Sequence, residues 1–251
     1  MKYGENKILL LFFLAVMIFA GCVKSPYIKP VDETLEKAKT NRKELVKVLE
    51  HYRDYPMKYE AAQFLISNMD EHLFAPYVLL NEDGEEVEFN VLDYPDYNSL
   101  KDGLKKIEEE EGELNFEVRK EDLVYDAEVL TADYLIENID YAFKAWRKLP
   151  WSKKYSFEVF KNYILPYRGS NEPLDNWRKP LYERYSPWAK KMEDPKELIE
   201  IAVMINDDIK SWFKFDPRFY VHPTDQSYCE MQDSKLGRCE DMTNITIYSF
   251  R

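Results

Sequence analysis

The stretch Thr131-Ala-Asp-Tyr-Leu135-Ile-Glu-Asn-Ile139-Asp-Tyr-Ala142-Phe143-Lys-Ala-Trp146 decides the fold class of this chain. Its apolar residues recur three or four positions apart, which places them on one stripe of an α-helix. Thr131 stands before the stripe and is a residue type that caps helix N-termini. The sequence therefore predicts an amphipathic helix that packs one face into a core.

The same spacing predicts further helices on both sides of this stretch. They cover residues 32–55, 56–72, 96–111, 156–165 and 195–213, and another begins at Cys239. Strand signals are confined to one hairpin, in which residues 77–80 and 87–91 flank the turn Asn81-Glu-Asp-Gly84. The predicted fold class is α+β, mainly α, with a helical N-terminal region over residues 32–190.

Residues 166–190 break the helical pattern because four prolines and Gly169 interrupt them. We expect a long ordered loop or an extended crossover here. Its aromatic and guanidinium side chains form a candidate substrate cleft for a peptide or a glycan, with Trp177, Arg178, Tyr185 and Trp188 as the residues involved. The alternative is that they pack the loop against the core, and this is favoured because aromatic side chains mostly fill cores and interfaces.

Composition limits the function classes. The chain has 251 residues, of which 45% are hydrophobic, enough for a sizeable core. Its net charge of −12 argues against nucleic acid as a partner. The three histidines, His51, His72 and His222, do not share the spacing of metal ligands, so neither a metal site nor a cofactor is expected.

The N-terminus has the features of an export signal. Lys2 and Lys7 precede an apolar run over residues 8–20, which is shorter than the roughly 20 residues that a membrane span needs. The run ends in Phe19-Ala20-Gly21-Cys22, which resembles a bacterial lipobox. The resemblance implies a signal peptide over residues 1–21, a lipid on Cys22 and a tether over residues 22–31. An uncleaved signal anchor is the alternative.

The lipid implies a location. Two acyl chains give stable membrane anchoring, so we expect a protein of the bacterial cell envelope that contacts the membrane through Cys22. No Asp follows Cys22 to retain it at the inner membrane, which favours the outer membrane. Cys229 and Cys239 would then lie in a compartment that permits a disulfide between them.

The last residues carry the clearest chemical signal, Gly237-Arg238-Cys239-Glu240-Asp241-Met242 leading into an apolar helix. A thiol at a helix N-terminus is stabilised as thiolate by the helix dipole, and Arg238 acts in the same direction. Glu240 and Asp241 oppose it. The alternative is a core cysteine, since cysteine is among the most buried residue types.

This motif resembles the transglutaminase-like, or papain-like, superfamily, in which a Gly-x-Cys step places the nucleophile at the start of the central helix. The resemblance covers about residues 130–251 and includes Tyr167-Arg168 and Asn171-Glu172-Pro173 upstream. It implies that residues 191–251 begin such a domain, with Cys239 as the nucleophile. The family's His and Asp follow this helix, so we expect that the chain stops before them. His222 lies upstream of the helix and is not assigned the role of the family's His.

Two functions follow as hypotheses. The first is a cysteine-dependent peptidase, amidase or acyltransferase in which Cys239 forms a thioester with a peptide or protein substrate. The second is a non-catalytic, lipid-tethered binding module. If the domain is incomplete, Met242, Ile245 and Phe250 should be partly exposed.

Overall fold

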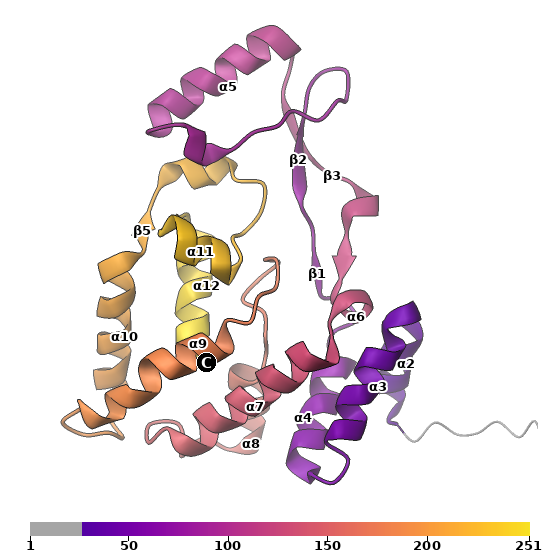
Figure 1. The fold of residues 1–251 in the computed structure, drawn as a ribbon, viewed down its shortest axis with the longest axis vertical. Helices are drawn as coiled ribbons and strands as arrows, with labels where there is room; N and C mark the ends of the chain where they lie inside the picture. Colours follow the sequence, from indigo (N-terminus) through magenta and orange to yellow (C-terminus); the bar gives the residue numbers. More distant parts are fainter. Residues whose placement is uncertain (1–26) are drawn as a thin grey trace, which may run out of the picture.

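The computed structural model describes residues 27–251, of which about 60% are helical (Figure 1). The remaining regular structure consists of three two-stranded sheets. The prediction of a mainly α fold with some β structure is confirmed. The predicted signal peptide and Cys22 lie outside the described residues. Within residues 27–251, none of the helices combines the length and the apolarity that a bilayer crossing requires.

A helical bundle forms the N-terminal part. Helices α2 (Lys29–Lys37), α3 (Arg42–His51) and α4 (Pro56–Ser67) lie together beside α7 (Ala132–Lys148) (Figure 1). The predicted helix over residues 32–55 is two helices, because a 3-10 turn at Lys39–Asn41 interrupts it. Helix α2 also starts inside the range predicted as tether.

Helix α7 agrees closely with its sequence pattern. The Thr131 hydroxyl accepts a hydrogen bond from the Tyr134 amide at 3.2 Å, so Thr131 caps the helix as predicted. Four of the five stripe residues are buried: Leu135, Ile139, Ala142 and Trp146. Phe143 is partly buried and packs edge-on against the Trp146 ring.

A long β-ribbon extends from the bundle toward α5 (Tyr97–Glu111) (Figure 1). Strand β1 (Leu73–Phe74) pairs with β4 (Val124–Tyr125), and β2 (Tyr77–Leu80) pairs with β3 (Asn115–Val118), both antiparallel. The predicted hairpin partner, residues 87–91, is wrong. The turn itself forms, with Gly84 at a φ of +77°, but the pairing back to β2 is limited to a bridge between Glu86 and Leu80 and a hydrogen bond from the Val87 amide to the Leu79 oxygen at 2.8 Å. The main partner of β2 comes from beyond α5, which local pattern does not reveal.

Several short helical segments lie between the longer elements. Three of them are 3-10 segments, at Val91–Asp93, Lys120–Asp122 and Ser186–Lys190. The others are the short helix α6 (Asp126–Val129), the turn α8 (Phe157–Val159), which continues as a π-helical segment (Phe160–Ile164), and helix α9 (Arg178–Tyr185). Helix α9 contradicts the predicted extended loop. Pro180 is the third residue of α9, where an amide has no intrahelical acceptor to lose.

The C-terminal part contains the second group of helices. Helix α10 (Leu198–Trp212) leads into β5 (Lys214–Phe215) and a 3-10 segment (Pro217–Val221), and α11 (Tyr228–Ser234) leads into β6 (Leu236–Gly237) and α12 (Cys239–Phe250). Strands β5 and β6 pair in parallel. Helix α12 packs against α9, α10 and α11.

The buried apolar residues form two clusters. One joins the N-terminal bundle to α7, and the other joins α9, α10, α11 and α12. Trp177, Leu181 and Tyr185 belong to the second cluster, and α9 also packs against α7.

Helix α12 is more deeply packed than the sequence indicates. Phe250 is 43% exposed and Met242 is half-buried, in agreement with the exposure predicted for these two residues. Ile245, expected to be partly exposed, is fully buried. It contacts the second apolar cluster, which already covers that face of α12.

Candidate functional site

Cys239 is the first residue of α12, and its side chain is exposed. The structure therefore places the thiol where the sequence predicted it, at a helix N-terminus. Cys229 is also exposed and lies in the first turn of α11. Both thiols are free, so the disulfide that the sequence left open is absent from the described residues.

The first turn of α12 is held by the buried side chain of Asp241. Its carboxylate accepts hydrogen bonds from the Arg238 amide at 2.9 Å, the Gln226 amide at 2.8 Å and the Gln226 side chain at 3.0 Å. Asp241 has no exposed surface. The carboxylate therefore fixes the start of α12 to the segment before α11 and sets the position of Cys239.

Gly237 allows the chain to pass close to this carboxylate. A Cβ at position 237 would lie 2.7 Å from the Phe213 ring and 2.8 Å from the side chain of Asp241. Both distances are shorter than ordinary van der Waals contact. The Gly-x-Cys step thus has a steric cause in this structure, independent of any resemblance.

Arg238 ties the preceding loop to the same helix start. Its guanidinium pairs with Asp225 at 2.6 Å and donates to the main-chain oxygens of Phe219 at 3.3 Å and His222 at 3.2 Å. These contacts hold the segment from Pro217 to His222 beside Cys239.

Tyr220 is the nearest titratable neighbour of the thiol. Its hydroxyl is hydrogen-bonded to the side chain of Cys239, and this bond raises the pKa of Tyr220. The phenol is 54% exposed.

The imidazoles of His222 and His72 have hydrogen-bond partners of their own. The His222 ring bonds the main-chain oxygen of Thr224 through Nδ1 at 2.8 Å and stacks on Phe219. His72 lies within hydrogen-bond distance of the Tyr167 hydroxyl, and burial lowers the pKa of His72. No hydrogen bond links a described imidazole to Cys239.

Cys229 has a different electrostatic environment. Its amide donates to the Asp175 carboxylate at 2.8 Å. Burial and the adjacent Asp175 raise the pKa of the Cys229 thiol, with Asp233 and Glu230 acting in the same direction. The two exposed thiols of this chain therefore form a natural pair for comparison.

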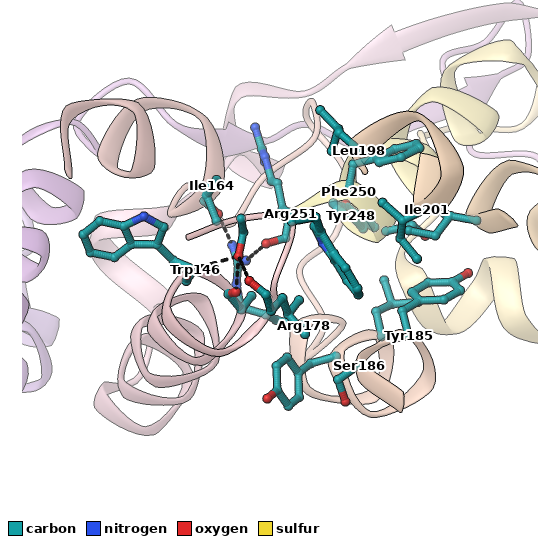
Figure 2. Close-up of a pocket in the computed structure, with 18 of the residues that line it drawn as sticks. Trp146, Ile164, Arg178, Tyr185, Ser186, Leu198, Ile201, Tyr248, Phe250 and Arg251 are labelled. Carbon is teal, nitrogen blue, oxygen red and sulfur yellow. Dashed lines mark hydrogen bonds between the residues drawn. The ribbon is translucent and has the colours of Figure 1, made fainter. Parts of the chain in front are cut away.

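The candidate cleft residues lie elsewhere, at the C-terminal end of α12. Trp177, Arg178 and Tyr185 line a cavity of about 260 Å³ (Figure 2). Trp188 packs edge-on against Tyr185, with ring centroids 4.9 Å apart, and is not part of the cavity wall. Cys239 and Tyr248 are nine residues apart on α12, or about 14 Å along its axis. The cavity and the thiol are thus separate sites.

Sequence reasoning missed a buried polar network around the loop at residues 167–172. Asp126 accepts from Tyr167 at 2.9 Å and from Arg168 Nε at 2.7 Å. Glu172 accepts from the amides of Gly169 and Ser170, and from the Tyr248 hydroxyl on α12. Its signal in the sequence was the charged and polar run Arg168-Gly-Ser-Asn-Glu172 within a proline-rich stretch.

Across residues 27–251, no three His, Cys, Asp or Glu side chains come together in a way that could hold a metal ion.

Comparison with known proteins assigns neither a family nor a function to this chain. No family model, no curated protein and no solved structure matches this chain.

Proposed function

We propose that this chain belongs to a lipid-anchored protein of the bacterial cell envelope that carries out cysteine-dependent acyl transfer through Cys239. The observation that carries the proposal is the exposed thiol at the first residue of α12, on a helix start that the buried Asp241 holds in place. A nucleophile needs both access to substrate and a fixed position.

The proposed chemistry is attack on an amide. The Cys239 thiolate adds to the carbonyl carbon of a peptide or protein amide, the C–N bond breaks, and the amine leaves with a proton. The resulting thioester then passes to water, which gives a peptidase or amidase, or to a second amine, which gives a crosslink.

The proton transfers need a base and an orienting acid. In the transglutaminase-like superfamily that the Cys239 motif resembles, these groups follow the nucleophile helix. The proposed activity therefore requires a base and an orienting acid in addition to Cys239.

The thiol is tested by its rate of alkylation. We expect iodoacetamide to modify Cys239 at least about ten times faster than Cys229 at pH 7, because burial and the adjacent Asp175 raise the pKa of the Cys229 thiol. Peptide mass spectrometry after short pulses over pH 5–10 measures both rates in one sample. Variants Cys229→Ser and Cys239→Ser assign the signals. Equal rates for the two thiols at every pH would contradict the nucleophile and favour the alternative of a non-catalytic binding module.

The anchor is tested at Cys22. In a bacterial host, the wild-type chain should appear in the membrane fraction with a lipid mass on its Cys22 peptide, and Cys22→Ala should lose that mass. Cys229→Ala is the matched control and should keep it. An unmodified Cys22 on a chain that retains residues 1–21 would instead indicate a signal anchor.

A further inference from the structure

Two adjoining hollows lie between the β-ribbon and the segment that precedes α11. The amide of Tyr77 on β2 donates to the main-chain oxygen of Pro223 at 3.2 Å, so these two parts of the chain are in contact (Figure 1). The hollows have volumes of about 470 and 320 Å³, within the range of about 300–1,000 Å³ that is typical of ligand clefts. Tyr77, Phe116 and Pro223 line both of them. The two hollows therefore form one groove, which we call the ribbon groove.

One end of the ribbon groove lies beside Cys239. The wall at this end includes Tyr220 and Arg238. The Tyr220 hydroxyl is hydrogen-bonded to the Cys239 side chain, and Arg238 is the residue before Cys239. A substrate whose reacting amide is at the exposed thiol can therefore extend into the groove.

The middle of the groove is aromatic. Tyr77 is paired with Val118 and Leu79 with Phe116 across the two strands, so all four side chains project from the same face of the ribbon. Tyr77 is 49% exposed and Phe116 is 42% exposed. Large apolar side chains gathered on an exposed surface are typical of binding sites. This part of the groove therefore suits an apolar side chain of a ligand.

The end of the groove away from Cys239 is acidic. Glu86, Glu88 and Asp93 line it, and within the described part of the chain no Lys, Arg or His side chain does. Glu86 pairs with Arg119 at 3.2 Å, whereas Glu88 and Asp93 are exposed carboxylates. A cleft lined by charges of one sign attracts ligands of the opposite sign. The electrostatics of this end therefore favour a cationic group.

We propose that the ribbon groove binds the substrate of Cys239, and that this substrate is an extended basic peptide. A lysine or arginine side chain lies near Glu88 and Asp93, and an apolar side chain packs over Tyr77 and Phe116. Charge complementarity selects a basic peptide over an acidic one of the same length. The inference rests on the proposed function, because it assigns the groove to the substrate of the Cys239 reaction.

The first test measures binding without reaction, on the purified full-length chain carrying Cys239→Ser. The probes are fluorescein-Ala-Ala-Phe-Ala-Lys-Ala-Lys-Ala-amide and the same peptide with both lysines replaced by glutamate. We expect fluorescence polarisation at about 50 mM salt, where surface charges are weakly screened, to give a Kd at least about five times lower for the basic peptide. Equal affinities would overturn the charge selection, and no binding of either probe at millimolar concentration would overturn the groove.

The second test locates the charge selection. The double variant Glu88→Lys with Asp93→Lys should remove the preference for the basic peptide, and both side chains are exposed, so the fold should tolerate the change. The matched control is Glu108→Lys with Glu110→Lys on α5, which changes the net charge equally outside the groove. An equal loss of preference in the two double variants would assign the effect to net charge and overturn the site.

The third test locates the apolar contact. Phe116→Ala should raise the Kd of both peptides by at least about fivefold, because it removes an aromatic ring from the middle of the groove. Val118→Ala is the control, since Val118 is exposed on the same face of the ribbon but does not line the groove. Equal effects of the two substitutions would overturn the assignment of the aromatic contact.

The last test joins the groove to the thiol in the wild-type chain. A saturating concentration of the basic peptide should slow iodoacetamide alkylation of Cys239 by at least about fivefold and leave the rate at Cys229 unchanged. An unchanged rate at Cys239 with the peptide bound would overturn the proposal that the groove leads to this thiol. The two proposals fail separately: equal intrinsic alkylation rates of the two thiols contradict the nucleophile, whereas absent peptide binding contradicts the groove alone.

Discussion

Asp241 shows how one buried side chain determines where α12 begins. The residue next to it, Glu240, is exposed, and both occur in the first turn, where acidic residues suit the helix dipole. Only Asp241 accepts hydrogen bonds from Arg238 and Gln226. Sequence alone treats the two acids as equivalent, because both lie in the first turn of the same helix.

The difference gives a prediction at residue scale. Asp241→Ala leaves three N–H donors without their acceptor, so the free energy of unfolding should fall by about 3 kcal/mol. Glu240→Ala should change it by less than about 0.5 kcal/mol, as expected of an exposed side chain. Urea denaturation of the two variants measures both values. A loss below about 1 kcal/mol in Asp241→Ala would mean that the carboxylate does not hold the helix start.

At the scale of elements, the sequence pattern correctly predicted helices that bury one face. Helices α5, α7 and α10 begin within a few residues of their predicted starts, since capping residues and apolar spacing act locally. The predictions failed at α9 and at the partner of β2. Pro180 was taken to block regular structure, although a proline in the first turn of a helix costs no hydrogen bond. Strand β2 found a partner 35 residues further on, across α5.

Gly169 lies where the loop after Tyr167 approaches α12 too closely to leave room for a Cβ. A Cβ at Gly169 would overlap the Asn244 side chain on α12, and Asn244 donates to the Ser170 hydroxyl at 2.9 Å. The loop after Tyr167 therefore lies directly against α12. This contact joins a segment of the first apolar cluster to a helix of the second.

At the scale of the whole molecule, a buried polar network links the two apolar clusters. Asp126 on α6 and Arg168 are both almost fully buried and form an ion pair, and Glu172 receives the Tyr248 hydroxyl of α12. Burial and the adjacent Glu172 raise the pKa of Tyr248, which keeps this hydroxyl protonated as a donor. The network therefore connects the N-terminal bundle to α12 and so to the helix that carries Cys239.

The network gives a prediction for the whole fold. Arg168→Met leaves Asp126 buried without its partner, so the free energy of unfolding should fall by about 3–5 kcal/mol. Arg184→Met breaks the more exposed pair with Asp208 and should cost less than about 1 kcal/mol. Thermal and urea unfolding of the two variants provide the comparison. Similar losses in both variants would show that the buried pair does not join the two parts.

The sequence by itself determined the mainly α class, most helix starts and the position of Cys239 at a helix N-terminus, because each depends on residues within a few positions of one another. Tertiary structure alone decided which strands pair, which acid fixes α12 and where the candidate cleft lies. It also separated Arg178 from Cys239 by most of the length of α12, placing a buried cation and an exposed thiol at opposite ends of one helix. These features depend on contacts between residues far apart in the chain, which local periodicity does not encode.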